Sequence, residues 1–387
     1  MDRFAEQLRR LRAKRGLSLR ELAAVVHYGK SYLHDLETGR KPPTAAVARR
    51  LDAELGGGGQ LIEAMRPEYA DDADSELEAV ELARRVTASD VSAETLNRME
   101  LAVDRMAMAY STTPPADLLP RVRRHLAYVS TLIDARKTYA QHRRLLVAGG
   151  WLSLLKATLH VDLRQSTAAD AHLVTANELA GQAEHREITA WCLETRAWQV
   201  LTGGYYRQAL ELSQQAQQVA PRDSSAFIQA AAQEARALAR LGDQVQTRQV
   251  LDRVAGLADH RPTPEHPEHH YQYDPAKAHA YAATTLAWAG DSAAESVARD
   301  VIAELNREGA RPRRVASAQL DLGLALLAAN KPDEAAATAS DAIRSGRIVP
   351  SNWWRASEVM AGVQRAGIAE ARDLRDQYEA FRPDGQS

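Results

Sequence analysis

The sequence predicts an all-α protein, in which a small N-terminal helical domain precedes a long stack of helical pairs. Three observations support this fold class. Alanine and leucine dominate the composition, whereas phenylalanine occurs only three times in 387 residues. Apolar residues recur at intervals of three or four, which is the period of an amphipathic helix. Beyond about residue 143, short turns recur every 37 to 48 residues, as in helical-repeat proteins.

Residues 4–55 predict four or five short helices. The first is expected to bury an apolar face at helical spacing, formed by Phe4, Leu8 and Leu11. Gly16 ends this helix, and Ser18 begins the second, where Glu21 three residues later completes a capping box. The second helix is expected to bury Leu19 or Leu22, together with Ala23 and Val26.

A turn that contains Gly29 leads into a third helix over residues 30–37. Two helices joined by a short glycine-containing turn are the signature of a helix-turn-helix motif. Leu33 and Leu36 fall on the inward face of the third helix. A final helix runs from Thr44 to Leu55, and the glycine run at residues 56–59 predicts a flexible linker after it.

These residues resemble the Cro/C1-type (xenobiotic-response-element) helix-turn-helix family. The pattern LRxLRxxRGLSxxELA is followed by a helix with Tyr-Leu and then by LETGRKPP, over roughly the first sixty residues. The resemblance implies a DNA-binding domain over residues 1–65 and a double-stranded DNA operator as its partner. Leu19 departs from the family, which often places a phosphate-contacting Gln at this position.

By this resemblance, the start of the third helix reads bases in the major groove. The expected base-reading positions are Lys30, Ser31, Tyr32, His34 and Asp35. Basic side chains around them are expected to contact the phosphate backbone: Arg12, Arg15, Arg20, Arg40 and Lys41. Between Met1 and Arg66 there are thirteen Lys or Arg against eight Asp or Glu, and this basic balance agrees with a nucleic-acid-binding module.

Residues 66–117 predict an acidic linker and a connecting helix. From Glu68 to Glu81 there are seven acidic residues and no basic one, although a short helix is possible within this stretch. Ala93 to Tyr110 has an apolar residue every three or four positions and predicts a helix.

Residues 118–387 predict five or six helical pairs, similar to tetratricopeptide repeats, stacked into an α-solenoid with a concave face. The turns include Gly204, Gly242 and Gly290. A helix-turn-helix module joined to such a body resembles regulators that are common in actinobacteria. It also resembles, more loosely, the peptide-sensing regulators of Gram-positive bacteria.

One step between turns contains an insertion at residues 260–270, with four histidines, two glutamates and three prolines. A metal site is one interpretation. The prolines prevent a helix that would hold such ligands on one face, and no His-Glu-x-x-His pattern is present, so we expect a stiff surface loop and no metal or other cofactor.

The tryptophans of the repeat body suggest a ligand groove. Trp151, Trp191 and Trp354 lie thirteen residues before a turn, and Trp198 lies six residues before one. These offsets predict side chains near the concave face, with Gln233, Arg236, Lys277 and Tyr281 as its polar groups. The alternative is that the tryptophans pack between neighbouring helices, since their amphipathic side chains serve both roles.

No catalytic motif is present, and neither a signal peptide nor a membrane span is apparent. A single cysteine, Cys192, indicates a buried structural thiol and a reducing compartment. The leading hypothesis is a cytoplasmic, homodimeric, sequence-specific transcriptional regulator whose repeat domain senses a peptide, small molecule or protein partner. The alternative is an interaction scaffold with a degenerate DNA-binding module.

Overall fold

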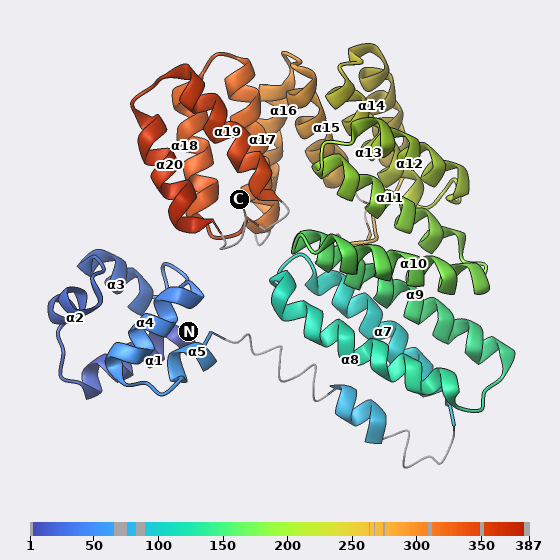
Figure 1. Ribbon diagram of the computed structural model, residues 1–387, viewed down its shortest axis with the longest axis horizontal. Helices are drawn as coiled ribbons and strands as arrows, with labels where there is room; N and C mark the ends of the chain where they lie inside the picture. Colours follow the sequence, from blue (N-terminus) through green and yellow to red (C-terminus); the bar gives the residue numbers. More distant parts are fainter. Residues whose placement is uncertain are drawn as a thin grey trace. The chain divides into compact units, whose positions relative to one another are not determined.

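The computed structural model describes residues 3–65, 76–82, 90–262, 264–266, 268–273, 275–308, 312–348 and 352–382. Every regular element in these ranges is a helix, which confirms the predicted fold class (Figure 1). Contacts divide the chain into two compact units, Met1–Ala79 and Val80–Ser387.

Residues 3–65 of the first unit contain five helices: α1 (Arg3–Lys14), α2 (Leu19–Val26), α3 (Lys30–Glu37), α4 (Ala45–Leu55) and α5 (Gln60–Glu63). Their apolar faces meet in one core, in which Leu8, Leu33 and Leu36 are fully buried as predicted. Of the two leucines left open for α2, Leu22 is the fully buried one, and Leu19 packs at the edge of the core.

Local capping sets the helix boundaries in this unit. Gly16 has a φ of +67° after α1, a conformation that glycine adopts without steric cost. The Ser18 hydroxyl accepts from the amide of Glu21, and the Glu21 carboxylate accepts from the amide of Ser18, which confirms the capping box. Thr44 caps α4 in the same manner, by accepting from the amide of Val47.

The predicted linker at the glycine run is wrong, because these residues form a tight turn inside the first unit. The buried carboxylate of Asp52 accepts from the amides of Gly59 at 2.5 Å and Leu61 at 2.8 Å. These bonds fold the chain back into α5, whose Leu61 is fully buried. Gly57 lies so close to Asp52 that a Cβ atom there would stand 2.4 Å from its Oδ1.

The second unit is a stack of antiparallel helical pairs (Figure 1). It opens with α7 (Ala93–Ala109) and α8 (Pro115–Asp134), and α7 packs against both α8 and α9. Six pairs follow: α9 (Tyr139–Asp162) with α10 (Ser166–Gln182), α11 (Arg186–Thr202) with α12 (Tyr206–Val219), α13 (Ser225–Leu241) with α14 (Gln244–Asp259), α15 (Pro275–Ala289) with α16 (Ala294–Glu308), α17 (Pro312–Ala328) with α18 (Pro332–Arg344), and α19 (Trp353–Ala366) with α20 (Glu370–Phe381).

The turn inside most of these pairs contains one residue with positive φ. Glycine provides it at Gly204, Gly242 and Gly367, whereas Arg164 and Asn330 adopt it elsewhere with φ of 57° and 58°. Each turn reverses the chain within a few residues, so the two helices of a pair pack side by side. The repeat spacing read from the sequence therefore marks real helix boundaries.

Helix α13 lies at the centre of the second unit. It contacts α11, α12, α14 and α15, and its residues 225–239 are all buried. Alanine at seven of these fifteen positions lets the neighbouring helices approach closely, but Gln229, Gln233 and Arg236 are buried there as well. Buried polar groups need hydrogen-bond partners, so the space beside α13 is a candidate binding site.

Candidate nucleic-acid interface and effector cavity

The first candidate site is the outward face of α3. Leu33 and Leu36 hold one side of the helix in the core, and this leaves Lys30, Ser31 and His34 exposed on the other. Two of these lie in the first turn, as the resemblance implies for side chains that reach base edges. Lysine can donate to guanine, and serine can pair with several bases.

Asp35, an acid on the helix that is expected to face DNA, has a partner within the domain. Its carboxylate forms an ion pair with the Lys41 ammonium at 3.0 Å. The same ammonium lies 5.9 Å from the ring centre of Tyr32, which packs edge-on against Tyr28. Lys41 therefore offsets the negative charge of Asp35, and the half-buried Tyr32 supports the loop rather than projecting freely.

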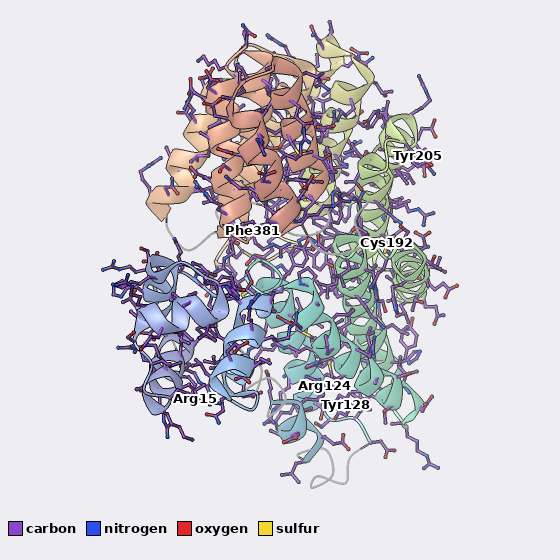
Figure 2. All side chains as sticks on the ribbon, turned by 60° about the vertical axis from the view of Figure 1, so that its left-hand side comes forward. Arg15, Arg124, Tyr128, Cys192, Tyr205 and Phe381 are labelled. Carbon is purple, nitrogen blue, oxygen red and sulfur yellow. The ribbon has the colours of Figure 1, made fainter. Side chains whose placement is uncertain are left out.

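The five predicted phosphate-contacting side chains have different surroundings. Arg12 donates to both carboxylate oxygens of Glu37, at 2.6 and 2.9 Å, and to the carbonyl of Leu17 at 2.7 Å. Its guanidinium thus joins α1 to α3 and holds α3 in position. Arg15 donates its Nε to the carbonyl of Leu55 at 2.9 Å, which caps α4, and its side chain lies at the surface (Figure 2). The exposed cations of the set are Arg15, Arg20, Arg40 and Lys41.

The second candidate site is a cavity of about 260 Å³ in the second unit. It lies among α11, α13, α15, α17 and α19, and five of the predicted ligand residues line it: Trp191, Trp198, Arg236, Lys277 and Tyr281. Its walls mix aromatic faces with convergent charged groups. That combination is typical of small-molecule sites.

The other three predicted ligand residues lie outside this cavity. Trp151 packs on Tyr271, with ring centres 4.8 Å apart, and Trp354 packs on Trp288 at 5.6 Å. Gln233 is fully buried on α13 and accepts from Arg236 at 3.3 Å. The two roles proposed for the tryptophans are therefore divided between them, since Trp151 and Trp354 pack while Trp198 lines the cavity, and Trp191 does both.

The expectation of a surface loop at the histidine-rich insertion, residues 260–270, is wrong at its C-terminal end, and the chain directly after the insertion is buried too. His269, Tyr271 and Tyr273 are buried, at 7%, 4% and 2% exposure. The amide of His270 donates to the carbonyl of Ala107 on α7 at 3.1 Å. Residues 268–273 thus run through the interior of the stack, because their aromatic rings are buried more favourably than exposed.

These aromatic rings close one side of the cavity. The ring of Tyr271 lies 5.2 Å from that of Trp191, and the ring of His270 lies 4.1 Å from that of Tyr110. Burial lowers the pKa of His270, and nearby Lys277 lowers it further. Within the described parts of the insertion and its surroundings, no three His, Cys, Asp or Glu side chains form a group that could hold a metal ion.

The polar groups beside α13 form a buried network. The amide of Gln229 donates to Glu194 at 2.9 Å and to the Tyr281 hydroxyl at 2.5 Å. Burial raises the pKa of Glu194 to about 7, which places it far above an exposed glutamate. This carboxyl group therefore carries only part of a negative charge at neutral pH.

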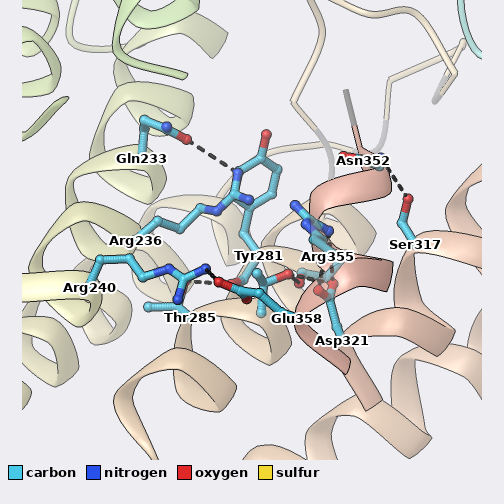
Figure 3. A network of polar contacts seen from close by, with 12 residues as sticks. Gln233, Arg236, Arg240, Tyr281, Thr285, Ser317, Asp321, Asn352, Arg355 and Glu358 are labelled. Atoms are coloured by element: carbon cyan, nitrogen blue, oxygen red, sulfur yellow. Dashed lines mark hydrogen bonds and ion pairs between the residues drawn. The ribbon is translucent and has the colours of Figure 1, made fainter. Parts of the chain in front are cut away.

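Arginines from α13 and α19 converge beside the cavity, together with acidic side chains (Figure 3). Arg355 forms a buried ion pair with Asp321 at 3.2 Å, and Arg240 forms a partly exposed one with Glu358 at 2.6 Å. Arg236 lies 4.9 Å from the ring centre of Tyr281. The sequence points only to Arg236 among these arginines, because Arg236 lies six residues before the turn at Gly242, whereas Arg240 and Arg355 lie at other distances from their turns.

Further lining residues escaped sequence reasoning altogether. They include Tyr110, Glu194, Gln229, His270, Arg313, Asp321 and Arg355. The adjacent Arg313 and Arg314 at the start of α17 are a local sequence feature that points to this part of the lining. Cys192, by contrast, is buried as predicted, and burial raises its pKa to about 12.

Comparisons with known proteins agree with the architecture of the first unit. Residues 3–65 match the family model described as a helix-turn-helix domain. No curated protein matches the chain.

None of the helices in the described ranges combines the length and apolar character that a bilayer span requires.

Two solved structures show weak similarity. One is Bacillus thuringiensis PlcR in complex with the peptide PapR7 and DNA, at 13% identity, covering 67% of this chain and 95% of that one, with a TM-score of 0.27. The other is the apo competence regulator ComR from Streptococcus vestibularis, at 12% identity, covering 95% and 99%, with a TM-score of 0.34. Neither likeness is close enough to bear on what this chain binds.

Proposed function

We propose that this chain is a DNA-binding transcriptional regulator, whose helical-repeat unit binds an effector in the cavity beside α13. The observation that carries the proposal is the helix-turn-helix domain at residues 3–65, with Lys30 and Ser31 exposed at the start of its third helix. A regulator of this kind works in the cytoplasm, where DNA is accessible and the buried Cys192 thiol stays reduced.

Two residues of the first unit, the family departure Leu19 and the acid Asp35, favour the alternative of a scaffold without DNA-binding activity. Both have structural partners within the domain: Leu19 packs against its core, and Asp35 is ion-paired with Lys41. Neither one obstructs the exposed positions at the start of α3. DNA binding therefore remains the function that these residues support best.

The proposal includes a homodimer. One helix-turn-helix domain covers a single half-site, and two half-sites about 34 Å apart give the specificity that regulation requires. Analytical ultracentrifugation of the full chain tests this part. A monomer at every concentration would contradict it without affecting DNA binding by the single domain.

The experiment for DNA binding begins with selection of bound duplexes from a random pool by the full chain. Lys30→Ala should then lose about 1–3 kcal/mol of binding free energy on the selected duplex and little on a scrambled one. Arg40→Ala should weaken both duplexes alike and lower the salt dependence, because phosphate contacts carry no sequence information.

Lys331→Ala is the matched control, since it removes a lysine from a surface ion pair with Glu295 in the second unit. It should bind both duplexes as the unmodified chain does. Equal losses for Lys30→Ala on selected and scrambled duplexes would mean that α3 does not read bases. Failure to enrich any duplex would contradict the proposed function itself.

A further inference from the structure

Three guanidinium groups surround the indole ring of Trp288. Their central carbons lie 4.2 Å (Arg240), 4.8 Å (Arg236) and 5.8 Å (Arg355) from its centre. Arg240 is paired with Glu358 and Arg355 with Asp321 (Figure 3). In the part of the chain that the structure describes, Arg236 has no acid within ion-pair distance, and its hydrogen bond is to the neutral amide of Gln233.

Burial of the Arg236 guanidinium without an ion-pair partner is energetically unfavourable. The residue is 3% exposed, and its Nε and Nη2 atoms have no hydrogen-bond partner among the described residues. The faces of Tyr281 and Trp288 stabilise the cation, but they do not accept its N–H groups in the manner of a carboxylate. Burial and the neighbouring Arg355 lower the pKa of Arg236 to about 10, which still leaves it charged at neutral pH.

The cavity that Arg236 lines carries an excess of positive charge. Its basic lining residues are Arg236, Lys277, Arg313, Arg314 and Arg355, and its acidic ones are Glu194, Glu268 and Asp321. Arg313 is also paired at 3.3 Å with the buried Asp162 behind the lining, so the five bases face four acids. The raised pKa of Glu194 reduces the negative charge further. A buried site with surplus cations is stabilised by an anion from outside, and arginine forms paired hydrogen bonds with carboxylates and phosphates.

The size of the cavity limits the ligand. At about 260 Å³ it lies just below the usual lower limit of roughly 300 Å³ for ligand pockets. One side of the cavity is closed by Tyr271 and His270, which pack against Trp191 and Tyr110. A compact molecule fits this space better than an extended peptide.

We propose that the cavity binds a small organic anion, with a carboxylate or phosphate group paired to Arg236 and an aromatic or apolar body against Trp191 and Trp198. The inference rests on the proposed function, because it names the chemical class of the effector. The carboxylates of Glu194 and Asp321 favour the charged form of Arg236 without touching it. The ligand supplies the directly hydrogen-bonded anion that the Nε and Nη2 atoms of Arg236 lack among the described residues.

The first test needs no ligand. Thermal unfolding of the full chain, followed by tryptophan fluorescence, is compared for Arg236→Met and Arg355→Met. Removing an uncompensated buried charge should raise the melting temperature by about 2 °C or more, whereas Arg355→Met strands the Asp321 carboxylate and should lower it. Arg236→Lys keeps the charge and should give no increase. If Arg236→Met lowers the melting temperature as Arg355→Met does, Arg236 is structural and the proposal fails.

The second test uses matched probes at about 10 mM, a concentration that reveals weak binding through stabilisation of the native state. Benzoate and phenyl phosphate should raise the melting temperature of the unmodified chain, and benzamide, the neutral analogue, should not. The larger of the two anionic shifts distinguishes a carboxylate from a phosphate ligand. Arg236→Met should abolish the difference between benzoate and benzamide.

An equal shift with benzamide, or no shift with either acid, would overturn the proposal, as would stabilisation only by a longer peptide such as Ala-Ala-Ala-Trp. Neither test involves DNA, so the two proposals fail separately. A chain that binds a selected duplex but does not distinguish benzoate from benzamide contradicts the anion site alone. A chain that makes this distinction but enriches no duplex contradicts the regulator assignment alone.

Discussion

Breaking the ion pair between Arg12 and Glu37 tests whether this pair holds α1 and α3 together in the helix-turn-helix domain. Both oxygens of the Glu37 carboxylate accept from the Arg12 guanidinium, at 2.6 and 2.9 Å. The side chains are 5% exposed for Glu37 and 21% for Arg12. The hydrogen bond to Glu37 raises the pKa of Arg12. Arg12→Met would leave the carboxylate buried and unpaired at the end of α3.

The expected loss follows from this burial. Breaking a buried pair costs about 3–5 kcal/mol of unfolding free energy, and the partial exposure of Arg12 places the value near 3 kcal/mol. A domain of this size has a free energy of unfolding of about 3–9 kcal/mol, so the substitution removes a large part of it. The double variant Arg12→Met/Glu37→Leu should recover to within about 1 kcal/mol of the unmodified domain, because no charge remains buried.

The assay must report on the first unit alone. All six tryptophans lie at position 151 or later, so tryptophan fluorescence reports only the second unit. Hydrogen exchange of peptides from residues 3–65, measured in the full chain at increasing urea, gives the free energy of opening for this domain. Arg12→Met, Glu37→Leu and the double variant complete a double-mutant cycle.

A positive coupling of at least about 2 kcal/mol is expected. If each single variant costs less than about 1 kcal/mol and the coupling is near zero, the pair behaves as an exposed surface salt bridge. The inference that Arg12 positions α3, rather than contacting phosphate, would then be refuted.

Three further predictions concern both units. Because burial raises the pKa of Glu194 to about 7, the folded state binds a proton more tightly than the unfolded state. The free energy of unfolding should therefore fall by about 3 kcal/mol as pH rises from 4.5 to 7 and then level off. Urea titrations of Glu194→Gln should show a smaller dependence on pH. Trp191→Ala should cost about 3–5 kcal/mol of stability in thermal melts, because the side chain is 3% exposed, whereas the less buried Trp198→Ala should cost clearly less; equal losses would contradict the division of roles. Gly57→Ala should destabilise the first unit by about 1–3 kcal/mol, because the new Cβ atom would lie 2.4 Å from Asp52 Oδ1. If hydrogen exchange of residues 3–65 is the same as in the unmodified chain, the turn accommodates the methyl group and the prediction is wrong.

The sequence by itself determined the elements whose signals are local. The Ser18 and Glu21 capping box lies within one helical turn, and Gly16 requires only its own backbone conformation. The spacing of the turns located the helical pairs of the second unit for the same reason. Each of these features depends on residues a few positions apart, and short-range hydrogen bonding and helical periodicity fix their conformation before any tertiary contact forms.

The tertiary structure decided which side chains share a site. Arg236, Trp288 and Arg355 come from α13, α15 and α19, and no local pattern relates them. The insertion reads as a polar, proline-rich loop, yet Tyr271 is drawn into the stack because aromatic neighbours from distant helices surround it there. Burial of an individual side chain depends on what packs over it, and that is a property of the folded chain rather than of any segment.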